Sequence, residues 1–203
     1  EYNPDDPDLV ISVGGDGTML TSVHQYLNQD VGYIGVHTGT LGFYTDYLKD
    51  EIDELIMAIK NNQYKINHRN LLEVSVYRHG KKDTYLALNE MRIDYGFVTQ
   101  VINVYIDDEL LEVFRGNGLC VSTPSGSTAY NKSIGGAVIY PGTPLMQLTK
   151  AAGIQHNAYR SLGSSLILDA SNVVKLVGHN FEQVYLGIDH LSYRIEDVES
   201  IEI

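Results

Sequence analysis

A glycine-rich turn between an apolar run and a helical pattern constrains the fold of this chain more than any other feature. Residues 9–13 (LVISV) are apolar and rich in β-branched side chains, and the turn GGDGT follows at residues 14–18. From Thr18 onward, apolar residues recur at helical spacing. A buried strand that runs through glycines into a helix is typical of a parallel α/β sheet. We therefore expect the turn at the carboxyl end of a strand, where open α/β sheets bind ligands.

The rest of the chain divides into an α/β part and a β-rich part. A strand at residues 33–36, the loop HTGTLGF and a helix over residues 50–60 continue the α/β pattern. After residue 64, short β-type runs separated by turn residues predict a β-sandwich. These runs are residues 72–77, 84–88, 101–106, 110–114, 119–122, 165–168, 173–177 and 184–188. Within this part we expect at least one helical stretch, near residues 144–152.

These patterns predict two domains, an α/β domain over residues 1–63 and a β-sandwich domain over residues 64–203. Only two α/β-type strands precede the sandwich, whereas sheets usually have about four to six strands. The sequence also stops within a strand-like run at residues 200–203. We therefore expect that the α/β domain is truncated and that residues are missing at both ends of the chain.

Composition limits the partners that this chain can have. With 26 acidic and 14 basic residues the formal charge is -12, which disfavours nucleic acid and anionic membrane surfaces as partners. The sequence contains neither a long apolar run nor a basic stretch followed by an apolar one, so we expect neither membrane insertion nor secretion. Cys120 is the single cysteine, which excludes a disulfide within the chain and favours a reducing compartment. We expect a cytoplasmic protein with Cys120 in its core.

Asp16 is the first candidate for chemistry, because it stands inside the glycine turn. Glycines let a phosphate approach the backbone, and the N-terminus of the following helix attracts it. A carboxylate there could accept a hydroxyl proton or hold a magnesium ion that bridges phosphates. The alternative is that Asp16 only caps the helix. The turn matches neither G-x-x-x-x-G-K-[ST] nor G-x-G-x-x-G, so it is neither of the two commonest phosphate loops.

Asn89 and Glu90 are the second candidate, at the end of the run TYLAL. Asn offers both donors and an acceptor and Glu accepts, so the pair could bind ribose hydroxyls or an adenine edge. By itself the dipeptide is also compatible with an ordinary turn.

Residues 123–131 (TPSGSTAYN) are the third candidate. Five hydroxyl side chains, a turn-forming proline and a glycine form a neutral cradle for polar ligand groups, and Tyr130 can stack on a base. A serine-rich cap of a helix has a similar composition, so the two interpretations stay open at this point.

The motifs GGDGTML, LNE and TPSGSTAYNKSIGGA, in this order, resemble the NAD kinase family, especially the enzymes of Gram-positive bacteria. HTGTLGF and GIDHLS strengthen the resemblance, which covers residues 8–194. It implies a Rossmann-like, phosphofructokinase-like N-terminal domain and transfer of a phosphoryl group from ATP to the 2′-hydroxyl of NAD. It further implies magnesium or another divalent metal, with inorganic polyphosphate as a possible second donor. Because members of the family assemble as homo-oligomers, the resemblance also implies a tetramer or dimer here.

The resemblance also implies roles for individual residues. Asp16 activates the 2′-hydroxyl of NAD, and no residue is assigned with certainty to the metal. The residues implied in substrate binding are Gly15, Gly17, Phe43, Tyr44, Asn89, Glu90, Arg115, Asn117, Thr128, Ala129, Tyr130, Ser133, Ala152, Ile154, Asp189 and His190. Of these, Asp189 and His190 are expected near the reactive ribose and the diphosphate, and Ala152 and Ile154 near the nicotinamide or a second adenosine position.

One position departs from the family pattern, and two other functions remain open. Asn117 in RGNG stands where the family has an aspartate that helps to bind the nicotinamide side, so the charge at that position is lost. A lipid kinase of the diacylglycerol type has a related glycine turn, but the charge of -12 disfavours membrane docking. A non-catalytic dinucleotide sensor is the other alternative, and we expect such a protein to have no need of Asp16.

Overall fold

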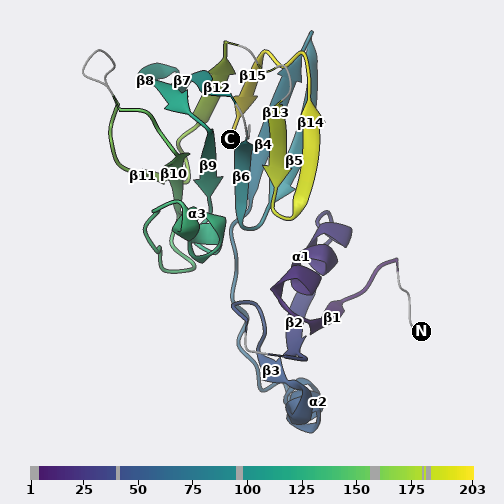
Figure 1. Ribbon diagram of the computed structural model, residues 1–203. Helices are drawn as coiled ribbons and strands as arrows, with labels where there is room; N and C mark the ends of the chain where they lie inside the picture. The colour runs from purple at the N-terminus through teal and green to yellow at the C-terminus, as the bar shows by residue number, and fades with distance from the viewer. Residues whose placement is uncertain (1–4, 40–41, 95–97, 156–160, 180, 182–183) are drawn as a thin grey trace. The chain divides into compact units, whose positions relative to one another are not determined.

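The computed structural model describes residues 5–39, 42–94, 98–155, 161–179, 181 and 184–203. The chain forms two compact units, Glu1–Asn67 and His68–Ile203, and each is described by itself. The first unit is an α/β unit and the second is almost entirely β (Figure 1).

The α/β unit is a three-stranded parallel sheet with two helices. Its elements are β1 (Leu9–Gly14), α1 (Asp16–Gln25), β2 (Gly32–His37), β3 (Tyr47–Leu48), the 3-10 turn η1 (Lys49–Glu51) and α2 (Ile52–Lys60). The strand order is β1-β2-β3, and Gly14 at the end of β1 is in register with His37 at the end of β2. The predicted strands and helices of this unit are therefore present, and the glycine turn joins β1 to α1.

The sequence predicted that strand β1 is buried, but in the structure one of its faces is exposed. Ile11 and Val13 are 48% and 59% exposed, whereas Ser12 between them is buried. Helix α1 packs against this strand and buries its own Met19, Leu20 and Val23, so it covers one face of the strand only. The apolar run of β1 therefore indicated a strand correctly but overstated its burial in this chain.

The second unit is a sandwich of two six-stranded sheets. Its strands are β4 (Leu72–Arg78), β5 (Lys81–Ala87), β6 (Glu90–Asp94), β7 (Gln100–Ile106), β8 (Glu109–Gly116), β9 (Gly118–Ser122), β10 (Leu145–Ala151), β11 (Leu166–Asp169), β12 (Val174–Gly178), β13 (Val184–Ile188), β14 (Leu191–Ile195) and β15 (Ser200–Glu202). One sheet, here the β6 sheet, has the order β11-β10-β9-β6-β13-β14. The other, the β4 sheet, has the order β5-β4-β15-β12-β7-β8. The predicted β-sandwich is confirmed.

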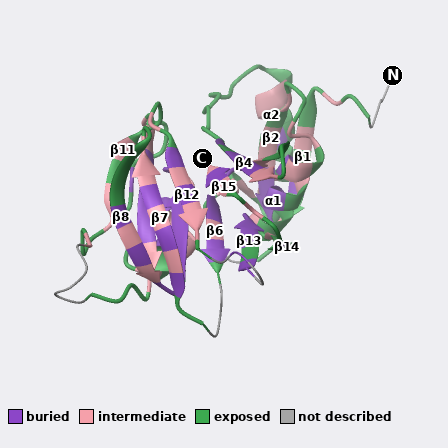
Figure 2. Ribbon diagram, turned by 90° about the horizontal axis from the view of Figure 1, so that it is seen from above, coloured by how far each residue is buried: buried purple, intermediate pink, exposed green. Residues whose placement is uncertain are grey.

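Alternating apolar residues of the two sheets form the core of the sandwich. Met91 and Ile93 of β6 and Val74 and Val76 of β4 are fully buried members of one cluster. Figure 2 shows buried residues concentrated on β6, β7, β12 and β13. Cys120 is buried and free, as the sequence predicted, and burial raises the pKa of its thiol.

The predicted helix over residues 144–152 is wrong, because this segment is strand β10. Met146 and Leu148 point into the core, while Gln147 and Thr149 alternate with them on the other face and are also buried. Leu, Met, Gln and Lys are good helix formers, so local propensity favoured a helix. Pairing with β9 on one side and β11 on the other decided for a strand.

The outer face of β10 is covered by the segment that follows β9 and contains the 3-10 turn η2 (Gly126–Thr128) and the short helix α3 (Tyr130–Ser133). Gln147 accepts a hydrogen bond from Ala137 N at 2.7 Å and donates to Ala137 O at 2.9 Å. Thr149 donates to Asn131 Oδ1 at 2.6 Å. The buried polar groups on the outer face of the strand are thereby satisfied, and the third candidate motif is fixed to the β6 sheet.

Candidate functional site

Asp16 joins the two loops at the carboxyl end of the parallel sheet. It is the first residue of α1, whose N-cap is Gly15, and no side chain caps this helix. Instead, Asp16 Oδ2 accepts a hydrogen bond from Phe43 N and Oδ1 accepts one from Tyr44 N, both at 3.0 Å. The interpretation of Asp16 as a helix cap is therefore wrong. Its carboxylate holds the loop that follows β2 against the glycine turn.

Residues 42–46, here the second loop, have little freedom around Asp16. A Cβ on Gly42 would collide with the Asp16 carboxylate, and a Cβ on Gly35 would collide with the backbone of Tyr44. Asp46 N also donates to Gly35 O at 2.9 Å. The loop therefore needs small residues beneath it, and it leaves the Phe43 side chain 68% exposed.

Neither backbone conformation nor packing within the described residues requires glycine at positions 15 and 17. Neither has a positive φ. A Cβ on Gly17 would meet no described atom within 4 Å, and a Cβ on Gly15 would meet only His37 Nε2, at 3.9 Å. The space over this turn is therefore open, which suits a ligand that approaches the backbone closely.

Asp189 organises the second candidate motif in the sandwich unit. Its Oδ2 accepts from Leu88 N at 2.8 Å, and its Oδ1 accepts from Asn89 N at 2.7 Å and from Glu90 N at 3.1 Å. Asp189 is 4% exposed and has a φ of 51°, in the left-handed region. The buried carboxylate thus fixes three consecutive backbone amides where the chain passes from β5 to β6. His190 follows in the turn to β14 and is exposed.

The second and third motifs meet at this point. Thr123 donates through Oγ1 to Leu88 O at 2.6 Å, and Thr123 N donates to Asn89 O at 2.9 Å. Gly126 N donates to Thr123 Oγ1 at 3.0 Å, and a Cβ on Gly126 would collide with the carbonyl of Asn89. Asn89 therefore lies in a connection between the two sheets, and Glu90 is the first residue of β6.

Glu90 is a buried carboxyl group with an unused oxygen. Its Oε2 has no hydrogen-bond partner among the described residues. Burial raises the pKa of Glu90 to about 7, the Asp189 carboxylate adds to the rise, and Arg92 opposes it. A desolvated acceptor of this kind favours a ligand that supplies a hydroxyl or amino donor.

The hydroxyl cradle expected from residues 123–131 is largely used inside the protein. Ser127 donates to Pro124 O at 2.7 Å and is fully buried, and Thr128 donates to Ser125 O at 3.4 Å. Ser133 donates to Tyr130 O at 2.7 Å. Ala129 carries no hydroxyl and connects η2 to α3. The segment is therefore a folded turn more than an open cradle, and neither η2 nor α3 has a side-chain cap from its own N-cap residue.

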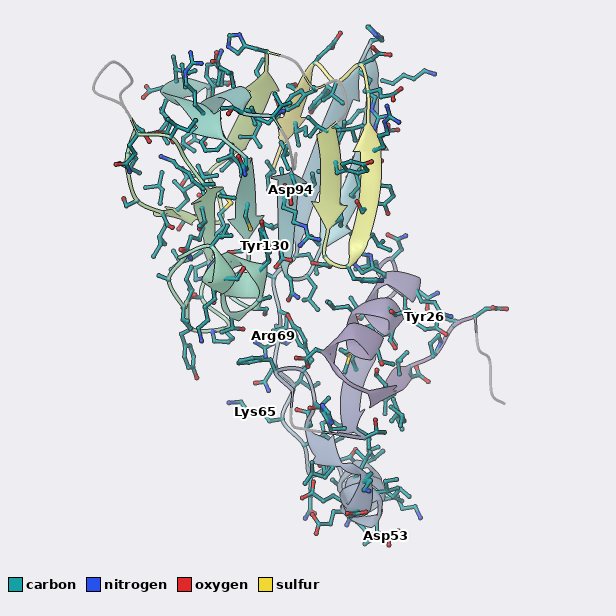
Figure 3. All side chains as sticks on the ribbon, in the orientation of Figure 1. Tyr26, Asp53, Lys65, Arg69, Asp94 and Tyr130 are labelled. Carbon is teal, nitrogen blue, oxygen red and sulfur yellow. The ribbon has the colours of Figure 1, made fainter. Side chains whose placement is uncertain are left out.

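Tyr130 is stacked by a residue that sequence reasoning missed. The guanidinium of Arg92 lies over the Tyr130 ring, 4.9 Å from its centroid. Arg92 crosses the neighbouring strand at Gly187, where a Cβ would collide with the arginine side chain. Tyr130 and Asp94, which lies two residues beyond Arg92 on β6, are labelled in Figure 3. The pairing of β6 with β13 brings Arg92 and Gly187 together. Because the two residues are distant in the sequence, no local motif predicts this contact.

The remaining predicted residues form a separate group at the β8–β9 turn. Ile154 N donates to Arg115 O at 2.7 Å, and Asn117 N donates to Ala151 O at 3.1 Å. Ala152 has a φ of 46°, in the left-handed region. The structure thus brings RGNG and AAGI together through their backbones. Beside them, Lys150 and Glu112 form a buried ion pair that the sequence did not indicate.

Two further observations concern metal ligands and membrane spans. Across the described residues, no group of three or more His, Cys, Asp or Glu side chains could hold a metal ion. No helix in the described part of the chain is long and apolar enough to cross a membrane.

Comparison with known proteins finds relatives of both units. Residues 2–64 match the family described as the ATP-NAD kinase N-terminal domain, and residues 88–189 match the ATP-NAD kinase C-terminal domain. The chain is 43% identical over 205 residues to an NAD kinase of Geobacillus stearothermophilus, which covers 99% of this chain and 76% of that protein. It is 44% identical over 205 residues to NAD kinase 1 of Listeria monocytogenes serovar 1/2a, with 99% and 78% covered.

Two solved structures have a similar fold. Yeast NADH kinase complexed with NADH has a TM-score of 0.86 and 27% identity, and covers 97% of this chain. The chain spans 57% of that yeast chain. An NAD kinase from Archaeoglobus fulgidus in complex with ATP has a TM-score of 0.75 and 22% identity, with 96% of this chain and 73% of that chain covered.

Proposed function

This chain belongs to the NAD kinase family, and we propose that it transfers the γ-phosphoryl group of ATP to the 2′-hydroxyl of the adenosine ribose of NAD. One observation supports Asp16 as the centre of this reaction above all others. Its carboxylate stands at the start of α1 beside the open turn of Gly15 and Gly17. That arrangement places a proton acceptor next to a phosphate-binding backbone.

Asp16 has capacity left for a substrate. Each carboxylate oxygen has two lone pairs, and each accepts one backbone amide of the second loop. The hydrogen bonds to Phe43 and Tyr44 fix the orientation of the carboxylate, so that it needs no reorganisation when the acceptor binds. In the transfer, the 2′-oxygen forms a bond to the γ-phosphorus, the bond to the bridging oxygen of ADP breaks, and the hydroxyl proton passes to Asp16.

In our proposal the acceptor nucleotide binds through the residues at the β5–β6 connection. Asn89 and Glu90 hold the adenosine of NAD, and the unused Glu90 oxygen accepts a hydroxyl or amino donor. Tyr130 stacks on the base, with Thr128, Ala129 and Ser133 along the same turn. Asp189 acts through the amides that it holds and is therefore a positioning residue. Arg115, Asn117, Ala152, Ile154 and His190 complete the proposed nucleotide contacts.

A divalent metal, magnesium above all, would enter on the phosphates of ATP. The described residues offer no acidic cluster for it, and magnesium commonly keeps several waters and uses few protein ligands. Asp16 is the one acidic side chain of the glycine turn that could contact it. When bound, the metal neutralises charge on the transferring phosphates. The assembly we propose is a homo-oligomer, dimer or tetramer, that works in the cytoplasm.

The two alternatives are less well supported. The family matches in both units concern NAD kinases, so a diacylglycerol-type lipid kinase is not favoured. For a non-catalytic sensor, the presence of Asp16 is a weaker argument than the sequence suggested, because the carboxylate also holds the second loop. A sensor would keep it for that reason alone, so activity has to be measured.

A donor-by-acceptor activity matrix tests the proposal. The full-length protein is incubated with magnesium and each combination of ATP or polyphosphate with NAD or NADH, and the 2′-phosphorylated product is quantified. We expect turnover with ATP and NAD. If no donor yields product while NAD still binds by calorimetry, the sensor is correct and the kinase proposal is wrong.

A further inference from the structure

His37 occupies a position at the glycine turn to which the family resemblance assigned no role. It is the last residue of β2 and is in register with Gly14, because β1 and β2 are parallel neighbours. The carboxyl ends of parallel strands meet at one edge of a sheet, where ligands bind. His37 therefore stands beside the glycine turn although 22 positions separate it from Gly15 in the sequence.

The hydrogen bond to Gly39 defines which ring nitrogen carries the proton. His37 Nδ1 accepts from Gly39 N at 2.7 Å, so Nδ1 is not protonated. In the neutral imidazole the proton is then on Nε2, which becomes a donor. The backbone N–H of Gly39 thus fixes one tautomer of the His37 ring.

The Nε2 donor is directed at the glycine turn and is not used within the described protein. Nε2 lies 3.9 Å from the position that a Cβ on Gly15 would occupy. The His37 side chain is 8% exposed, and the described residues offer Nε2 no hydrogen-bond acceptor. A phosphate oxygen at this place would give the Nε2–H donor a charged acceptor.

The start of α1 supplies the rest of such a site. The first N–H groups of a helix have no acceptor inside the helix, and the positive end of its dipole attracts anions. Above Gly17 the space is open. A phosphate on this turn would therefore contact the helix N-terminus from one side and His37 from the other.

We propose that His37 is a phosphate-binding residue of the transfer reaction, and that its Nε2–H donates to a substrate phosphate on the Gly15–Gly17 turn. The inference rests on the proposed function for the identity of the substrate. The phosphate belongs either to ATP or to the diphosphate of NAD, and the two share the same chemistry. Kinetics with each nucleotide varied separately distinguishes them.

Two substitutions separate the roles of the two ring nitrogens. In His37→Gln the side-chain amide reaches the position of Nε2 and retains a donor there. In His37→Asn the side-chain oxygen takes the position of Nδ1, so the bond from Gly39 is kept and the distal donor is lost. The exposed His68, substituted in the same two ways, is the matched control.

The experiment measures kcat/KM for ATP at saturating NAD and for NAD at saturating ATP. We expect His37→Asn to lower kcat/KM for one of them about 10-fold or more, with a normal melting temperature, while His37→Gln stays within about 3-fold of the wild type. The nucleotide whose KM rises is the source of the phosphate. Unchanged kinetics in both variants would overturn the proposal, and so would a loss in His37→Gln that His37→Asn does not show.

Binding of inorganic pyrophosphate keeps this test independent of the activity. Calorimetry should give a weaker Kd for His37→Asn than for the wild type and for His68→Asn. If the wild-type protein forms no NADP but the pyrophosphate difference is found, the proposed function fails and the role of His37 stands. If all three proteins bind pyrophosphate equally, His37 does not bind phosphate.

Discussion

Asp16 in the α/β unit and Asp189 in the sandwich unit both accept hydrogen bonds from backbone N–H groups. They differ in how far their carboxylates are exposed to a ligand. Asp16 accepts two amides from the second loop and remains partly exposed. Asp189 accepts three consecutive amides and is 4% exposed. Burial, more than the hydrogen-bond pattern, thus separates a carboxylate that can meet a substrate from one that shapes the protein.

The largest expected effect is on activity at Asp16. Asp16→Asn removes the proton acceptor, and we expect kcat to fall about 100-fold to 10,000-fold. NAD affinity should change little, because the amide oxygen still accepts one of the two loop N–H groups. The measurements are steady-state kinetics and calorimetry with NAD. A matching loss of NAD affinity would show that Asp16 acts mainly by holding the loop.

For Asp189 we expect the substitution to lower the free energy of unfolding, whereas at Asp16 the main effect is on kcat. Asp189→Asn tolerates the left-handed φ, but it replaces one carboxylate oxygen with an amino group that faces a backbone N–H donor, and it removes the charge from the remaining hydrogen bonds. We expect this to cost about 3 kcal/mol of unfolding free energy. Urea denaturation of both aspartate variants measures this. If Asp16→Asn proves as destabilising as Asp189→Asn, the distinction between the two carboxylates is wrong.

Glu90 is a third buried or partly buried carboxyl group, and its effect on stability should depend on pH. Its pKa of about 7 lies above the ordinary value of 4.5, so the folded state prefers the protonated form. Its contribution to stability is full below pH 4.5 and is lost as the pH rises through 7. Glu90→Gln should therefore raise the unfolding free energy on the order of 2 kcal/mol at pH 8 and much less at pH 5. Equal effects at the two pH values would contradict the shifted pKa.

A pair of glycines tests how rigid the two carboxylate sites are. A Cβ on Gly126 meets the backbone carbonyl of Asn89, whereas a Cβ on Gly42 meets the end of the Asp16 side chain. We expect Gly126→Ala to cost about 1–3 kcal/mol of stability, because backbone cannot move aside. Gly42→Ala should cost less stability but lower activity, since it displaces the Asp16 carboxylate. Thermal melts with parallel assays compare them.

The smallest expected effect concerns Arg92 and Tyr130. Arg92→Ala removes the cation from the Tyr130 ring, a contact of about 0.5–1 kcal/mol, so KM for NAD should rise about two-fold to five-fold. The conservative variant Arg92→Lys should restore part of this, and kcat should not change. An unchanged KM in both variants would show that Tyr130 keeps its position without Arg92.

Local patterns were sufficient where a motif is contiguous. The run before Gly14 predicted β1, the spacing after Thr18 predicted α1, and the alternating runs predicted most strands of the sandwich. They were insufficient at residues 144–152, where helix-forming side chains lie in β10. There the polar side chains alternate with core residues and are satisfied by a segment that precedes them in the chain.

The sequence by itself determined the two kinds of unit, the place of the glycine turn and the family. Only the tertiary structure decided what the side chains do there. It showed that Asp16 accepts loop amides, that Asp189 holds the connection at Asn89, and that His37 stands beside Gly15. The physical reason is that these contacts join residues that are distant along the chain, through strand register and burial. A local pattern records a residue's neighbours in sequence, whereas hydrogen bonds and desolvation depend on its neighbours in space.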